Sequence, residues 1–168
     1  MARKSSPHVN RNEVRVFVPA PHFSLFETER AGKPAVVVVN DALFEFPATE
    51  IFPWQLCVTI CGDGSMTSEE SDVLFAISDE IESVTLRGRT SQGSENALFI
   101  GRVSIGTVRE LLFQVHDPEV ANDSLQNLLQ SRTWPREWRY EMKGDSEWSH
   151  ASGLLRLVTR PSSTTATH

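Results

Sequence analysis

Residues 67–84 read TSEESDVLFAISDEIESV, and this stretch decides the fold class. Thr67, followed three residues later by Glu70, matches a capping box, which marks the start of a helix. At 100° per residue, five apolar side chains then fall within about a 100° arc. This stripe predicts a helix that packs one face on a core, and its members are Val73, Leu74, Ile77, Ile81 and Val84.

Strand patterns lie on both sides of this helix. Residues 53–60 alternate before it, and residues 97–103 and 108–116 follow it as two strands separated by a short turn. Asp117-Pro118 predicts a second helix, because an Asp N-cap followed by Pro favours a helix start. Residues 137–143 alternate again as a further strand, the sixth when the two strands of an N-terminal hairpin are counted. The predicted core contains Trp54, Leu56, Val58, Leu74, Ile77, Ile81, Leu98, Ile100, Leu111 or Leu112, Leu125 and Leu128.

This order of elements predicts an α+β protein, a ferredoxin-like βαββαβ sandwich with an additional N-terminal β-hairpin. The hairpin is expected at residues 22–28 and 35–39, and it must extend the sheet or cover its other face. The run at 35–39 is uninterrupted and β-branched, which is typical of a strand buried on both sides. Residues 153–158 are interpreted as a last extended segment.

The domain organisation predicted from composition is simple. Residues 1–21 are polar and proline-containing and are expected to form a flexible N-terminal arm, with a short strand at residues 14–18. Residues 22–158 form a single domain, and residues 159–168 lack apolar side chains and are expected to be a disordered tail.

Composition indicates a soluble protein of the cytoplasm. No apolar run approaches the roughly 20 residues of a membrane helix, and no apolar segment follows the charged first residues as in a secretory signal. Cys57 and Cys61 lie four residues apart in one strand, about 13 Å, which is too far for a disulfide. No neighbouring His or Cys completes a zinc signature. We therefore expect reduced, half-buried cysteines, no metal and no cofactor.

Charge is unevenly distributed along the chain. The net charge is −6, and the first 20 residues carry +3, so the remainder carries −9. An acidic body argues against a nucleic-acid partner, which requires a basic face. It is compatible with a basic protein partner, because charge of one sign steers association.

Several segments, in this order, resemble the bacterial domain of unknown function 695 (DUF695). They are Gly32-Lys33-Pro34-Ala35, Phe52-Pro53-Trp54, residues 97–103, His116-Asp117-Pro118-Glu119 and Asp145-Ser146-Glu147-Trp148. The resemblance covers roughly residues 23–155. Some members are fused to a domain resembling regulator of ribonuclease E activity B, which is ferredoxin-like and acts by binding. The family is named for its lack of an assigned function, so the resemblance by itself implies no activity or ligand.

Two arginines form the first candidate site. Arg102 and Arg109 flank the turn between the fourth and fifth strands, and together they would bind an anion or a carboxylate bidentately. The alternative is that they pair with glutamates on neighbouring strands, namely Glu110, Glu137 or Glu141.

The outward face of the first helix forms the second candidate site. Asp72, Phe75, Asp79 and Glu82 fall within about an 80° arc opposite the apolar stripe. A Phe among carboxylates on an outward face suggests contact with a basic partner. The alternative is that the N-terminal arm or residues 87–96 cover the ring.

Trp148 is a third candidate, either as a binding anchor or as a plug at the edge of the core. None of the five histidines has the spacing of a metal-binding helix or a nucleophile elbow, so no catalytic residue is predicted. The favoured function is a noncatalytic protein-binding or regulatory module that acts through the acidic helix face or an open sheet face. The alternatives are an immunity protein that neutralises a bacterial toxin, and a small-molecule or anion-binding domain.

Overall fold

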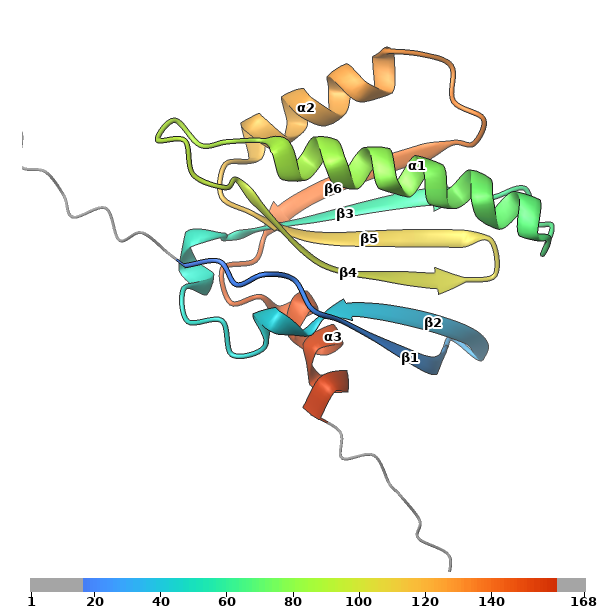
Figure 1. The fold of residues 1–168 in the computed structure, drawn as a ribbon, viewed down its shortest axis with the longest axis horizontal. Coiled ribbons are helices and arrows are strands. Elements are labelled where there is room, and N and C mark those ends of the chain that lie inside the picture. The colour runs from blue at the N-terminus through green and yellow to red at the C-terminus, as the bar shows by residue number, and fades with distance from the viewer. Residues whose placement is uncertain (1–16, 160–168) are drawn as a thin grey trace, which may run out of the picture.

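The computed structural model describes residues 17–159, which form an open six-stranded antiparallel sheet with three α-helices (Figure 1). The expectations for residues 1–16 and 160–168 lie outside this range. In chain order the elements are β1 (Phe23–Arg30), β2 (Lys33–Asn40), the 3-10 helices η1 (Asp41–Leu43) and η2 (Thr49–Ile51), β3 (Trp54–Cys61), α1 (Ser68–Arg87), β4 (Ala97–Ile105), β5 (Val108–Val115), α2 (Pro118–Gln130), β6 (Trp138–Gly144) and α3 (Ser149–Thr159).

The N-terminal hairpin extends the sheet. The strand order is β1-β2-β4-β5-β3-β6, and β2 pairs antiparallel with β4. The contact between these two strands is close at Gly101, where a Cβ would lie 2.5 Å from the carbonyl oxygen of Val38. Glycine at this position therefore allows the hairpin to join the sheet. Of the two alternatives for the hairpin, extension of the sheet is the one found.

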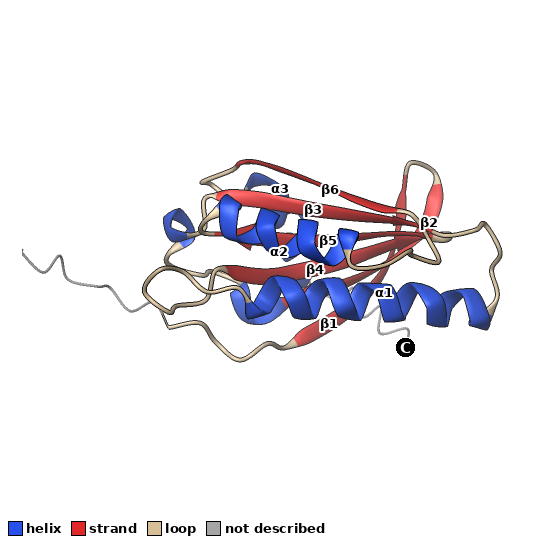
Figure 2. Ribbon diagram, turned by 90° about the horizontal axis from the view of Figure 1, so that it is seen from above, coloured by secondary structure: helices blue, strands red, loops and turns tan. Residues whose placement is uncertain are grey.

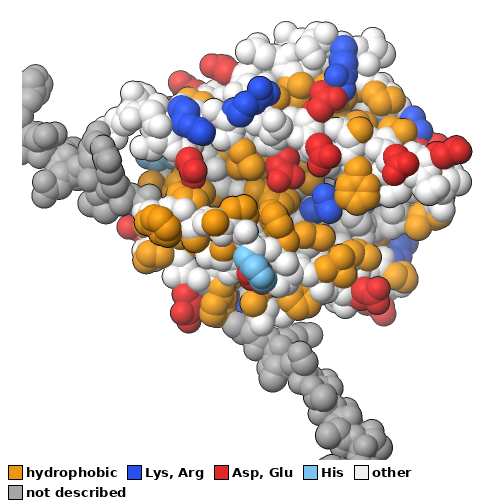
Figure 3. Space-filling model, viewed as in Figure 1, with side chains coloured by type: hydrophobic (Ala, Val, Ile, Leu, Met, Phe, Trp, Pro, Cys, Tyr) orange, Lys and Arg blue, Asp and Glu red, His pale blue; other side chains and the backbone are white. Residues whose placement is uncertain are grey.

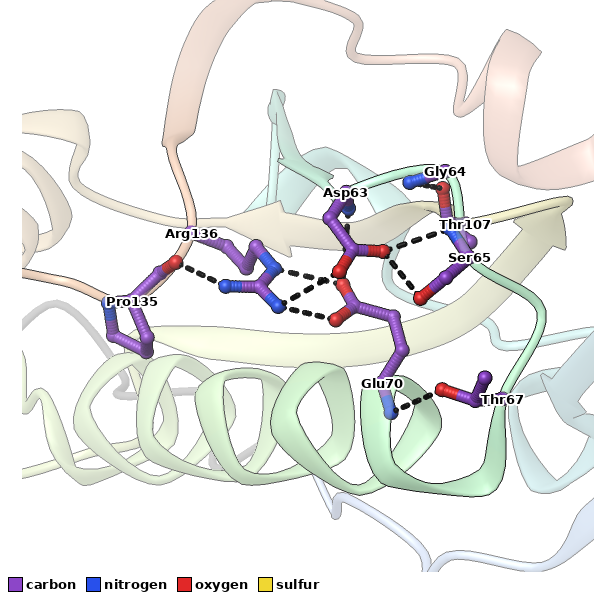
Figure 4. Close-up of polar contacts among 8 residues, drawn as sticks. All are labelled: Asp63, Gly64, Ser65, Thr67, Glu70, Thr107, Pro135 and Arg136. Atoms are coloured by element: carbon purple, nitrogen blue, oxygen red, sulfur yellow. Dashed lines mark hydrogen bonds and ion pairs between the residues drawn. The ribbon is translucent and has the colours of Figure 1, made fainter.

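The start of α1 is fixed by side chains from three segments. The Thr67 hydroxyl accepts a hydrogen bond from the Glu70 backbone N–H at 3.2 Å, so the predicted N-cap is confirmed. The Glu70 carboxylate does not complete a capping box but pairs with Arg136 and accepts the Asp63 backbone N–H (Figure 4). The hydrogen bonds from Arg136 hold the pKa of Glu70 below its ordinary value. This network ties the start of α1 to the segment that leads into β6.

Hydrophobic side chains form one cluster on each face of the sheet. α1 and α2 pack on one face and α3 packs on the other, as Figure 2 shows from above. Most predicted core residues are buried, but Leu128 is only half-buried, and Trp54 is exposed at the first position of β3, so its placement in the core was wrong. The buried residues of the predicted core that lie on the α1 face are Leu56, Val58, Leu74, Ile77, Ile81, Leu111 and Leu125, whereas Leu98, Ile100 and Leu112 lie on the α3 face.

The C-terminal segment is a helix, not the extended segment that was predicted. Ala151, Leu154 and Leu155 are buried on one side of α3, at the spacing of a helix. Asp145 caps this helix, because its carboxylate accepts the backbone N–H groups of Ser149 and His150 at 2.9 and 3.3 Å. Gly153, where the predicted extended segment began, lies inside this helix.

Candidate functional site

The two candidate sites predicted separately lie together in the structure. The ring of Phe75, on α1, lies over Arg109 of β5, with the guanidinium carbon 4.0 Å from the ring centroid. Arg102 of β4 approaches the same ring at 4.8 Å. We name these three residues the Phe75 cluster. The ring is still 40% exposed, so neither the loop at 87–96 nor any other part of residues 17–159 covers it completely.

Arg109 is the buried member of the cluster. Arg109 is only 7% exposed, and its Nη2 donates a hydrogen bond to the Ser71 hydroxyl at 3.1 Å. The other terminal nitrogen, Nη1, is buried and has no hydrogen-bond partner within residues 17–159. Burial, and secondarily the charge of Arg102, lowers the pKa of Arg109 from its usual range. A guanidinium in this position lacks a compensating anion.

The expected ion pairs with neighbouring glutamates are absent. No carboxylate of the described residues lies within 4.0 Å of a guanidinium nitrogen of Arg102 or Arg109. The alternation of strand side chains explains this, because adjacent residues such as Arg109 and Glu110 point to opposite faces of the sheet. Glu141 pairs in register with Cys57 and shares the α3 face with Glu110. Glu137, directly before β6, is four residues from Glu141, so the strand alternation directs it to the same α3 face.

The carboxylates of the predicted helix face surround the Phe75 ring without pairing with the arginines. Asp72 and Asp79 are exposed, and Glu82 is half-buried. Burial raises the pKa of Glu82, while the charge of Arg102 opposes this shift and that of Asp79 adds to it. Acidic side chains therefore flank the ring on α1, but the face is not wholly outward, because the ring lies over buried Arg109.

A second apolar surface lies beside the Phe75 cluster, on the same side of the sheet. Leu25 is 64% exposed, Phe23 49% and Val36 38%, and Val38 is half-buried. We name these four residues the β1–β2 open face. Phe23 contacts the Phe99 ring edge to face at 6.0 Å, which places it on the α1 side. Figure 3 shows hydrophobic side chains gathered over β1 and β2, below the acidic side chains of α1.

The two surfaces are continuous through the strand register. Leu25 pairs with Val38, and Val38 pairs with Arg102, so three neighbouring strands place these side chains in one row. The sequence did not predict this row, because β2 was interpreted as buried on both sides. In fact the valines alternate: Val37 and Val39 are buried, whereas Val36 is exposed and Val38 is half-buried. The alternation of residues 23–28 was the available signal for a strand with one open face.

Trp148 does not act as an exposed anchor. Its ring is buried, stacks on Phe46 at 5.4 Å, and its indole N–H donates to the carbonyl oxygens of Thr49 and Phe52 at 3.0 Å each. Its role is the alternative one, a plug between α3 and the η1–η2 segment. The interpretation as a binding anchor was therefore wrong.

A His, a Ser and an Asp side chain also meet where β1 begins. The Ser24 hydroxyl donates to the Asp41 carboxylate, and His22 Nδ1 lies 2.6 Å from the other oxygen of the same carboxylate. No group of three or more His, Cys, Asp or Glu side chains in residues 17–159 is placed to hold a metal ion. Cys57 and Cys61 are free and half-buried in β3, as predicted.

Comparison with known proteins adds no relative. No family model, no curated protein and no solved structure matches this chain. The resemblance to DUF695 therefore stays a prediction that rests on the segments quoted above. Among the helices of residues 17–159, none is long and apolar enough to cross a membrane.

Proposed function

We propose that this chain is a noncatalytic protein-binding module whose partner docks on the β1–β2 open face and the adjoining Phe75 cluster. The observation that carries this proposal is the exposure of Phe23, Leu25, Val36 and Phe75 in adjoining positions on one side of the sheet. Contiguous apolar side chains with a charged border are typical of protein interaction sites. Single exposed apolar residues need no such explanation, but an adjoining set does.

The proposed partner is basic. The whole chain has a net charge of −6. Residues 1–16 carry +3 and Arg160 carries +1, so the net charge of the described residues is −10. Exposed carboxylates of Asp72 and Asp79 border the surface on α1, and those of Glu27 and Glu29 border it on β1. Such a border favours encounter with a positive surface.

The fold is in keeping with a binding role. We propose that β3, α1, β4, β5, α2 and β6 form a ferredoxin-like unit to which the β1–β2 hairpin adds two strands. The strand order β4-β5-β3-β6 and the placement of both helices on one face support this. The hairpin then carries the apolar surface beyond the edge of the helical layer.

Cross-linking tests the proposal. A photoreactive amino acid at Leu25 should give one main adduct in cells, whereas the same amino acid at Asp123, an exposed position on α2, should not. Adding Phe23→Asp to the Leu25 probe should abolish the adduct while the chain stays folded, with a melting temperature lowered by only a few degrees through loss of the Phe99 contact. Equal adducts from both positions, or an adduct that persists in the Phe23→Asp chain, would contradict the proposal.

A second candidate function is anion binding at Arg102 and Arg109. The buried, unpaired Nη1 of Arg109 favours it, since a buried guanidinium nitrogen lacking a partner is costly. Titration with sodium sulfate against sodium chloride at equal ionic strength tests it. Sulfate should shift the Arg102 and Arg109 side-chain NMR signals selectively, and this selectivity should be lost in Arg102→Gln. Identical responses to both salts would exclude this function.

A further inference from the structure

The helical layer on the α1 side leaves part of the sheet uncovered. α1 packs on β4 and β5, and in Figure 1 no helix lies in front of β1 and β2. Neighbouring strands lie about 4.8 Å apart, so two strands present a width of roughly 10 Å. Packed helices have axes about 8–10 Å apart. The uncovered width therefore matches one helix placed beside α1.

The length of the open face also suits a helix. β1 and β2 each contain eight residues, which span roughly 26 Å at 3.3 Å per residue. A helix of about 17 residues has the same length at 1.5 Å per residue. We infer that the partner contributes a basic amphipathic helix, which packs on the β1–β2 open face as a third helix of this layer. This inference rests on the proposed function and specifies the partner's recognition element.

The chemistry of the surface specifies this helix further. Its apolar stripe would cover Phe23, Leu25 and Val36, the most exposed apolar groups of the two strands. Lys or Arg residues on one flank would face Asp79 of α1, and those on the other flank would face Glu27 of β1, both of which are exposed. The side toward β1 is acidic at Glu27, whereas on the side toward α1 the guanidinium of Arg102, next to Val38 in the register, lies before Asp79. The helix would therefore place its basic residues against Glu27 and, beyond Arg102, against Asp79.

A strand added to the edge of β1 is the competing mode of recognition. β1 is the outermost strand and its outer backbone groups are unpaired within residues 17–159. A strand at that edge would satisfy the backbone groups but would leave Leu25 and Val36 uncovered on the face of the sheet. The exposed apolar groups therefore favour a helix across the face over a strand at the edge.

A designed peptide tests the inference on the full chain. The probe is a fluorescein-labelled helix of about 17 residues with a Leu stripe and Lys on both flanks, and binding is measured by fluorescence anisotropy. Its matched controls replace the Lys residues with Glu, or place a Pro at the centre to break the helix. The Lys peptide should bind, and each control peptide should bind at least about tenfold more weakly.

Protein variants locate the binding site of the probe. Leu25→Asp should weaken binding of the Lys peptide at least about tenfold, since it places a charge under the apolar stripe. Asp123→Asn, on the exposed side of α2, should leave binding unchanged. Both changes lie at exposed positions, and thermal melts equal to that of the wild type verify that the variants are folded.

Several results would overturn the inference. These are an absence of binding by the Lys peptide, equal binding by the Pro-containing peptide, or equal binding by Leu25→Asp. A dimer that Leu25→Asp dissociates would assign the face to a second copy, and a gain in peptide affinity on removal of residues 1–16 would assign it to the chain's own N-terminus. If the peptide fails but the cross-link at Leu25 persists, the protein-binding function holds and only the helical partner is wrong.

Discussion

Replacement of Phe75 tests whether its ring stabilises two guanidinium groups. Phe75→Leu keeps an apolar side chain but removes the π face that lies 4.0 Å from Arg109 and 4.8 Å from Arg102. Each cation–π contact at a partly exposed site contributes about 0.5–1 kcal/mol, so the variant should lose about 1–2 kcal/mol of unfolding free energy. For a domain of this size, that corresponds to a melting temperature lower by roughly 2–8 °C.

Urea and thermal unfolding measure this loss, with Ser83→Ala as a control at an exposed position of the same helix. A double-mutant cycle with Arg102→Gln should give a coupling energy of about 0.5–1 kcal/mol between the ring and that arginine. Phe75→Leu melting at or above the wild-type temperature would refute the stabilising role of the ring. Because the ring has this structural role, Phe75→Ala alone is a poor test of partner binding, and Leu25 is the better position.

Three further changes test other parts of the structure. Gly101→Ala should lower the unfolding free energy by about 1–3 kcal/mol, whereas Gly144→Ala, with open space around it, should not; equal stabilities would contradict the tight strand contact. Burial raises the pKa of the Cys57 thiol to about 11. In a Cys61→Ser variant at pH 9, iodoacetamide should therefore react with Cys57 about 50-fold or more slowly in the native chain than in the urea-unfolded chain. Similar rates for the two states would contradict the burial of Cys57. Because the pKa of Glu70 is lowered in the folded chain, its carboxylate stabilises the fold above the unfolded-state pKa of about 4.3, and this stabilisation is lost as the pH falls. Glu70→Gln should therefore lower the unfolding free energy more at pH 7 than at pH 3. A loss of unfolding free energy that is equal at both pH values would contradict this.

Local sequence signals predicted most of the sheet and two of the helices. The Thr67 cap and the Asp117-Pro118 start are confirmed by their hydrogen bonds, because both depend on side chains within three residues of the helix start. α3 was missed because its cap comes from Asp145, four residues before the helix begins, so no cap residue stands directly before the helix. The stripe of Ala151, Leu154 and Leu155 was the signal that could have found it.

The candidate site could be predicted in parts but not as a unit. The helix wheel identified Phe75, and the strand positions identified Arg102 and Arg109, yet their contact depends on where α1 crosses the sheet. The open face of β2 could not be predicted either, because Val36 and Val38 have the same character as their buried neighbours. Only the number of helices on that side of the sheet decides which of these valines is exposed.

Binding kinetics with the partner recovered through the Leu25 cross-link test the protein-binding function most directly. Leu25→Asp should mainly speed dissociation, since it removes apolar contact, and the double variant Asp72→Lys and Asp79→Lys should slow association and flatten its dependence on salt. Neither change should lower the melting temperature by more than about 2 °C, because all three side chains are exposed. Wild-type association and dissociation rates in both variants, at low and at high salt, would contradict the assignment of this surface to a basic partner.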